Sequence, residues 1–219
     1  GNLIITTDDD CTVPKNWIEN IINSHKKHAN TVSIQGRIYS VPKDSIYSLI
    51  IQKQKDYRIK KSMRNKGETI FLDCCNTSFK KSILKKIKIT FDETMLSASD
   101  TEFAAKIIQS NGAILYDDRI VVYHNERNNL KEFLLQRFRK GSSPIQLKER
   151  WPSYNFHFFH SHLRNHLTTF FVICKFLTSR KRTLDIFRLP LILIAAIAVY
   201  ELGGAYYLAK SWQEKFLRR

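Results

Sequence analysis

Three adjacent carboxylates, Asp8, Asp9 and Asp10, follow a short apolar run at positions 3–5. The run predicts a buried strand, and side chains along a strand alternate between its two faces. Asp8 and Asp10 are therefore expected to point to the same place, while Asp9 points away. Two convergent carboxylates form the hard-oxygen site that Mg²⁺ or Mn²⁺ prefers, and such an ion commonly bridges a substrate diphosphate. The alternative is an acidic turn that caps the following helix.

Asp100 lies at the start of a predicted amphipathic helix, whose apolar face carries Phe103, Ala104, Ile107 and Ile108. Aspartate is a frequent N-cap residue, which is the simpler role for Asp100. A carboxylate at this position could instead act as a general base that removes the proton of an attacking hydroxyl.

His124, Gln136 and Arg139 are further candidates for a binding site. His124 ends an apolar strand, where it is either a structural histidine, a metal ligand or a diphosphate contact. Gln136 and Arg139 are three residues apart on a predicted helix and so share a face. The Arg139 guanidinium could hold a phosphate, or it belongs to a solvated basic face.

The elements that must position these residues alternate between strands and helices. Apolar runs predict strands at 3–5, 31–34 (closed by Gly36), 113–116 and 120–123. Helical patterns open near 12–14, with Trp17, Ile18, Ile21 and Ile22 on one face, and at 100 and 130–139. This alternation favours an α/β fold.

Composition limits the partners. The 219 residues are 43% hydrophobic, enough for a sizeable core, and carry a net charge of +16, which favours polyanions such as nucleic acid, anionic lipid or nucleotide diphosphates. A basic run at 53–66 is either a solvated helix or loop, or a contact with phosphate or lipid. Its only aromatic residue is Tyr57, which argues against a nucleic-acid-binding module.

Cysteine spacing indicates no zinc site, because Cys11, Cys74, Cys75 and Cys174 form no CxxC pair. We expect four reduced thiols in a cytosolic compartment. The chain opens without an initiator methionine or a signal peptide, so we expect it to begin inside a longer protein.

The carboxyl-terminal part has a different character. Residues 151–186 are rich in aromatic and basic side chains and predict a connecting helical region. Residues 187–210 are almost wholly apolar and long enough to cross a membrane, which predicts a transmembrane helix. Glu201 favours the alternative, an interfacial or core helix, because a carboxylate at mid-membrane depth is costly.

Several motifs in order resemble family 2 glycosyltransferases. The acidic segment LIITTDDDCTVPKNWI resembles the family's DxD segment, and DCCNTSFKK resembles the segment before its acceptor-site helix. The segment FDE, followed by SDTEF, resembles the family's FDE…EDTDL block. The strand pair that ends in YH resembles its YH segment, and QRFRKG resembles its QxxRW segment. Ser99 replaces the family's usual Glu, and Lys140 replaces the Trp.

The resemblance covers residues 1–150 and implies a partial GT-A fold that lacks the strands preceding the acidic motif. It implies that Asp8, Asp10 and His124 hold Mg²⁺ or Mn²⁺ on the diphosphate of a nucleotide sugar. Asp100 would be the catalytic base of an inverting transfer, with His124, Gln136 and Arg139 near the diphosphate or the acceptor.

We therefore expect a membrane-associated enzyme whose catalytic domain lies on the cytoplasmic side. Its donor would be a nucleotide sugar and its acceptor a glycan or a lipid-linked glycan. The alternative is a catalytically inactive membrane-bound remnant, or a fragment that depends on a partner.

Overall fold

The computed structural model describes residues 1–152, 171, 174 and 183–217, which form two compact units. Unit 1 comprises 1–44, 54–93 and 99–126, and unit 2 comprises 45–53, 94–98 and 127 to the carboxyl terminus. The connecting region predicted at 151–186 lies mostly outside the described residues.

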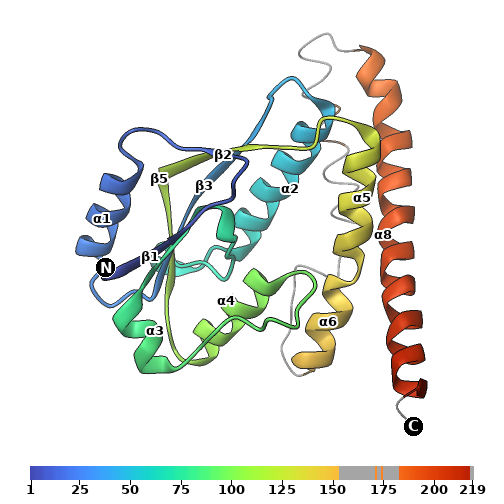
Figure 1. The fold of residues 1–219 in the computed structure, drawn as a ribbon. Helices are drawn as coiled ribbons and strands as arrows, with labels where there is room; N and C mark the ends of the chain where they lie inside the picture. Colours follow the sequence, from blue (N-terminus) through green and yellow to red (C-terminus); the bar gives the residue numbers. More distant parts are fainter. Residues whose placement is uncertain (153–170, 172–173, 175–182, 218–219) are drawn as a thin grey trace. The chain divides into compact units, whose positions relative to one another are not determined.

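Unit 1 is built on a five-stranded mixed sheet in the order β1-β4-β3-β5-β2 (Figure 1). Only β3 and β5 run parallel, while the other neighbouring pairs are antiparallel. The strands are β1 Leu3–Thr6, β2 Cys11–Thr12, β3 Ser33–Val41, β4 Thr77–Lys80 and β5 Ile114–Asn125. The predicted α/β fold is confirmed.

Two strand predictions were wrong in extent. Gly36 does not close the second strand, because β3 continues to Val41, and the runs at 113–116 and 120–123 are one strand, β5. The pairing of β3 with β5 shifts register after Gly36, where Asn76 donates hydrogen bonds to the carbonyls of Arg37 and Ile120 at 2.8 and 2.9 Å. Asn76 thus satisfies backbone groups that the irregular ladder leaves unpaired.

The helices of unit 1 pack on two apolar clusters. They are α1 Trp17–Lys27, α3 Lys81–Ile87 and α4 Ser99–Gln109, with short 3₁₀ turns η1 Asn65–Gly67 and η2 Cys74–Asn76. Helix α1 begins at Trp17 rather than near 12–14, because Cys11 and Thr12 pair with β5. Trp17 and Ile21 are buried, but Ile18 and Ile22 are exposed, so the predicted apolar face of this helix was too wide.

Helix α4 follows the prediction more closely. Phe103, Ala104 and Ile107 are all buried, and they pack with Phe79 of β4 in one apolar cluster. Asn111 follows the helix with a φ of 56°, the left-handed conformation that commonly ends helices.

Unit 2 is helical, with α5 Leu130–Gly141, α6 Ser143–Arg150 and α8 Thr183–Leu217. Residues 45–53 of helix α2 Ile46–Ser62 also belong to it. Phe133 packs with Leu189, Ile192, Leu193 and Ala196 in its core. Helix α8 runs beside α5 (Figure 1). A Cβ at Gly203 of α8 would lie 2.8 Å from the carbonyl carbon of Phe138 of α5, so the backbones of the two helices are in contact there.

The predicted apolar helix at 187–210 lies within α8. Its stretch Leu184–Glu214 has the length and composition to cross a membrane. Large apolar side chains of this stretch remain exposed on the face opposite the core: Leu184, Phe187, Leu191, Ile194, Leu202, Tyr206 and Trp212.

Candidate metal centre

His124 lies between the two carboxylates that the sequence singled out. Its Nε2 atom is 3.3 Å from Oδ1 of Asp10 and 3.7 Å from Oδ2 of Asp8. Asp9 is exposed to solvent. The structure therefore brings together the three predicted metal ligands, two carboxylates and one imidazole.

Backbone contacts hold these residues in place. The Cys11 amide donates to the Asp8 carbonyl at 3.3 Å, which closes a tight turn between β1 and β2. Cys11 then pairs directly opposite His124 of β5, and the amide of Asn125 donates to the Asp10 carbonyl at 3.0 Å. The short strand β2 thereby fixes the acidic turn against the end of β5.

Glu126 orients the imidazole from its other side, and sequence reasoning missed it. His124 Nδ1 lies 3.1 Å from Oε1 of Glu126, which also accepts hydrogen bonds from Lys55 Nζ at 2.7 Å and Ser40 Oγ at 2.9 Å. Despite burial, hydrogen bonding from His124 and the charge of Lys55 lower the pKa of Glu126 to about 2. For metal binding, the charged carboxylate would favour the tautomer with the proton on Nδ1, which directs the Nε2 lone pair toward an ion beside Asp8 and Asp10.

Lys55 belongs to the basic run at 53–66, which is therefore not simply a solvated surface. Residues 53–62 of the run form the later part of α2, and Lys55 is largely buried in its ion pair with Glu126. Glu126 follows His124 by two residues, directly after β5 ends at Asn125. This spacing places both side chains on one face of an extended chain and was the available signal.

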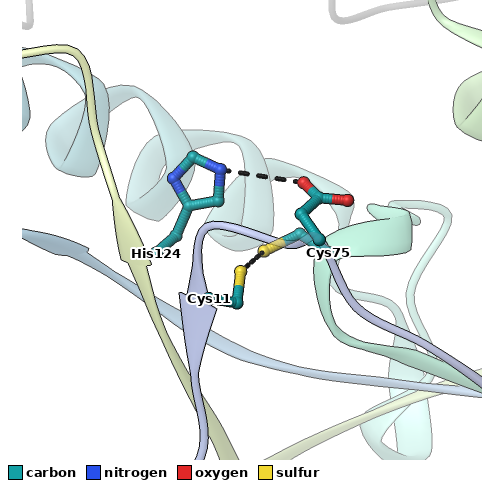
Figure 2. A group of neighbouring side chains, drawn as sticks. Cys11, Cys75 and His124 are labelled. Carbon is teal, nitrogen blue, oxygen red and sulfur yellow. Dashed lines mark hydrogen bonds and ion pairs between the residues drawn. The ribbon is translucent and has the colours of Figure 1, made fainter.

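Two cysteines complete a second possible set of ligands. Cys11 Sγ lies 3.3 Å from Cys75 Sγ, and His124 stands beside them (Figure 2). One ligand atom from each of Asp8, Cys11, Cys75 and His124 lies within 4.8 Å of the other three. All four cysteines of the chain are free thiols, as predicted. The prediction of no zinc-type grouping rested on spacing alone, and the fold joins residues that are far apart in sequence.

Negative charge accumulates around Asp8. Partial burial and the neighbouring carboxylates of Asp73, Asp10 and Asp9 raise the pKa of Asp8, although His124 opposes them. Such repulsion is relieved by a bound cation. A divalent metal site requires negatively charged oxygen ligands and well-oriented neighbours. The two carboxylates and the imidazole fixed by Glu126 meet this requirement, so the residues fit Mg²⁺ or Mn²⁺.

Asp100 lies in the same electrostatic neighbourhood. Burial raises the pKa of the Cys74 thiol to about 12, and the carboxylates of Asp100, Asp73 and Asp8 add to the rise. Both Asp100 and Asp8 therefore lie close enough to Cys74 to act on it. Asp100 is inside the first turn of α4, and its carboxylate accepts a hydrogen bond from the Thr101 amide at 2.7 Å.

Gln136 and Arg139 lie on α5 in unit 2, where Gln136 is half-buried and Arg139 is exposed. Their helix is confirmed, and their roles at the diphosphate or the acceptor stay a prediction. Arg137 between them is buried, with its guanidinium over the ring of Phe133 at 4.7 Å, which is a packing role.

Comparison with known proteins finds a family match for the amino-terminal part. Residues 1–88 match the family described as Glycosyl transferase family 2. The fold is similar to that of mannosyltransferase PcManGT from Pyrobaculum calidifontis, solved in complex with GDP-Man and Mn²⁺. The two chains share 16% identity with a TM-score of 0.50, and the match covers 99% of this chain and 56% of that chain. No curated protein matches.

A second solved structure is TarS residues 1–349 from S. aureus in complex with UDP-GlcNAc, at 12% identity and a TM-score of 0.43 over 96% of this chain and 68% of that chain. The resemblance noted in the sequence is confirmed over residues 1–88, and the fold is a partial GT-A-like sheet. The chain spans 56% of the length of the mannosyltransferase chain.

Proposed function

We propose, from the family 2 match over residues 1–88 and the GT-A-like sheet, that this chain is a glycosyltransferase. It moves a sugar from a nucleotide diphosphate sugar to an acceptor hydroxyl with inversion. The observation that carries this proposal is the grouping of Asp8, Asp10 and His124 around one point, with Glu126 fixing the imidazole.

Asp8, Asp10 and His124 would hold Mg²⁺ or Mn²⁺. Bound there, the ion would supply positive charge that offsets the charge of the departing nucleoside diphosphate. Gln136 and Arg139 are assigned to contacts with that diphosphate or with the acceptor, because amide and guanidinium groups donate hydrogen bonds to oxyanions.

Asp100 is assigned as the general base. It takes the proton of the acceptor hydroxyl while the acceptor oxygen bonds to the anomeric carbon, and the electron pair of the breaking sugar–oxygen bond leaves with the diphosphate. Support comes from the neighbourhood that Asp100 shares with Asp8 around Cys74, since both carboxylates act on that thiol.

The acceptor is assigned as a glycan or a lipid-linked glycan at a membrane. The exposed apolar face of α8 and the net charge of +16 suit contact with an anionic leaflet, and a nucleotide-sugar donor requires the cytoplasmic side.

A second candidate follows from the 56% coverage of the mannosyltransferase chain. The chain would be an inactive remnant or a partner-dependent fragment, which binds the metal but transfers no sugar.

Metal binding and transfer are tested separately. The wild-type chain is expected to bind one Mn²⁺ ion, measured as the loss of the free Mn²⁺ signal in electron paramagnetic resonance. The Asp8→Asn and Asp10→Asn variants are expected to lose Mn²⁺ binding, while Asp9→Asn keeps it. Retention by Asp8→Asn plus Asp10→Asn would remove the metal assignment. Circular dichroism of each variant checks that it is folded.

Transfer is measured with radiolabelled nucleotide sugars and membrane extracts as acceptors, with and without Mn²⁺. Wild-type chain is expected to transfer only with the ion, and Asp100→Asn to bind Mn²⁺ normally but lose transfer. Full transfer by Asp100→Asn would remove the base assignment, and Mn²⁺ binding without any transfer would favour the second candidate.

A further inference from the structure

We propose that Asp8, Cys11, Cys75 and His124 form a second, thiolate-containing metal site that takes Zn²⁺ or a similar soft divalent ion. The four ligand atoms lie within 4.8 Å of one another, with the two sulfurs 3.3 Å apart. This site shares Asp8 and His124 with the proposed Mg²⁺ or Mn²⁺ site, and it replaces Asp10 by two sulfurs.

Two of the separations between ligand atoms are close to those around a tetrahedral ion. Two sulfurs bound to zinc at about 2.3 Å each stand about 3.8 Å apart in a tetrahedron, so Cys11 and Cys75 need to separate by only about 0.5 Å. The 3.7 Å between His124 Nε2 and Asp8 Oδ2 is within a few tenths of an ångström of the separation that zinc-bound nitrogen and oxygen need.

The backbone presents these ligands before any ion binds. Cys11 and His124 face each other across the β2–β5 ladder, and the turn bond from the Cys11 amide fixes the Asp8 carbonyl. Cys75 sits in η2, where the Asp73 carboxylate accepts its amide at 3.1 Å. Gln35 supports that turn by accepting the Asp73 amide at 2.6 Å.

The chemistry of the two sets separates the ions they take. Thiolate and imidazole ligands select zinc-like ions, while carboxylate oxygens suit Mg²⁺ and Mn²⁺. Binding of Zn²⁺ would displace one proton from each thiol. The two thiolates would then balance the charge of the ion, and the Asp8 carboxylate would add one negative charge. Asp8 is about half exposed and offers the ion a path from solvent, whereas Cys75 is almost fully buried.

Because two ligands are shared, Zn²⁺ and Mn²⁺ cannot both occupy their full sets. We therefore expect Zn²⁺ to displace bound Mn²⁺ from the wild-type chain. The site itself does not depend on sugar transfer, so it stands or falls independently of the enzyme assignment.

Cadmium is the spectroscopic probe, because cadmium–thiolate bonds absorb in the ultraviolet, and a phosphine reductant keeps the thiols reduced. Titration of the full chain is expected to give a thiolate band that saturates at one ion per chain. Cys11→Ser and Cys75→Ser are each expected to lose most of the band and at least tenfold of the Zn²⁺ affinity, which a chromophoric chelator measures by competition. The matched control Cys174→Ser keeps both.

The two sites are separated by opposite variants. Asp10→Asn is expected to lose Mn²⁺ binding and keep the cadmium band, while Cys75→Ser is expected to lose the band and keep Mn²⁺ binding. The retained binding of each variant also shows that it is folded. The proposal is overturned if Cys11→Ser plus Cys75→Ser binds Zn²⁺ as tightly as the wild type, or if Cys174→Ser abolishes the band.

Protection from alkylation gives an independent measurement without substitutions. Zn²⁺ should slow iodoacetamide labelling of Cys11 and Cys75, read by peptide mass spectrometry, and leave Cys174 unaffected. Equal protection of all three thiols, or of none, would contradict the proposed site.

Discussion

Glu126 is a charged side chain held inside the protein, and its partners explain why it is tolerated there. Lys55 and Ser40 each give it a hydrogen bond, and His124 uses its Nδ1 side. A buried carboxylate is stable only when paired in this way. Its place behind the imidazole makes it a positioning residue for the candidate metal centre and not a ligand.

Replacing Glu126 by Gln should weaken Mn²⁺ binding by about 10- to 100-fold, because a neutral amide no longer fixes the imidazole tautomer. Paramagnetic resonance titration gives the affinity, and Glu132→Gln on the exposed face of α5 is the matched control. Unchanged affinity in a folded Glu126→Gln protein would show that His124 is oriented without it.

His25 gives unit 1 a dependence on pH. Burial lowers the pKa of His25 to about 4, and the charges of Lys80 and His28 add to the effect. Its Nε2 lies 2.9 Å from Ser78 Oγ. Since the folded pKa is below the unfolded value of 6.5, the unfolded state takes up the proton first. Stability from His25 is thus complete above the unfolded pKa and is lost as the pH falls toward the folded one.

The loss between these two pKa values is at most on the order of 3 kcal/mol. Denaturant unfolding at pH 7 and pH 5 should show a smaller decrease for His25→Gln than for the wild type. An equal decrease in His25→Gln would assign the acid sensitivity to other groups.

At the scale of elements, the junction of β3, β5 and η2 is the tightest point of the sheet. A Cβ at Gly36 would lie 2.3 Å from Nδ2 of Asn76 and 2.5 Å from the Ile120 carbonyl oxygen. The Asn76 amide also accepts the Trp17 indole N–H at 3.0 Å, so one side chain joins α1, both strands and the turn that carries Cys75. Cys75, the one proposed metal ligand in η2, directly precedes Asn76.

Gly36→Ala should therefore lower the free energy of unfolding by about 2 kcal/mol or more, because it displaces the Asn76 amide and leaves buried carbonyls unpaired. Thermal or urea unfolding measures the change. Gly67→Asn is the control, since a Cβ there meets nothing within 4 Å and asparagine tolerates its φ of 77°. A Gly36→Ala protein as stable as the wild type would mean that the junction relaxes easily.

At the scale of the whole molecule, the described residues divide into a sheet unit with the candidate metal centre and a helical unit with the apolar helix α8. Helix α8 has 35 residues, about 50 Å at the usual rise, which exceeds the hydrocarbon core of a bilayer. One face packs with α5, which also carries the exposed charged residues Lys131, Glu132 and Arg139. Charged residues on a helix that packs with α8 favour a position partly in the interfacial region, and the predicted membrane span stays a prediction.

The exposed apolar face of α8 should bind membranes in either arrangement. Leu191→Lys plus Ile194→Lys should release the chain from anionic vesicles in a flotation assay, because each lysine costs about 2.5–3.5 kcal/mol in the hydrocarbon. Leu96→Lys, an equally exposed leucine outside α8, is the control. If the wild-type chain resists alkaline carbonate extraction, α8 spans the membrane, and if it is extracted, α8 is an interfacial helix. If the two lysines leave flotation unchanged, this face of α8 does not bind the membrane.

The sequence by itself determined the elements whose pattern is local. Apolar periodicity and terminal signals were sufficient for β1, α4, α5 and the apolar part of α8. The sequence also singled out Asp8 and Asp10, although a tight turn after β1 brings them together and not the strand alternation on which the prediction rested, and a strand end placed His124. Such features could be predicted because a few neighbouring residues contain all the information that they need.

Only the tertiary structure decided which distant residues meet. Cys11 and Cys75 are 64 residues apart, and Lys55 and Glu126 are 71 apart, yet each pair is in contact. These contacts depend on the register of β2 against β5 and on the packing of η2, which arise from long-range strand pairing and burial. Spacing rules for metal ligands assume neighbours in sequence, so they could not reveal the pair of thiols or the ion pair of Lys55 with Glu126 that the fold assembles near His124.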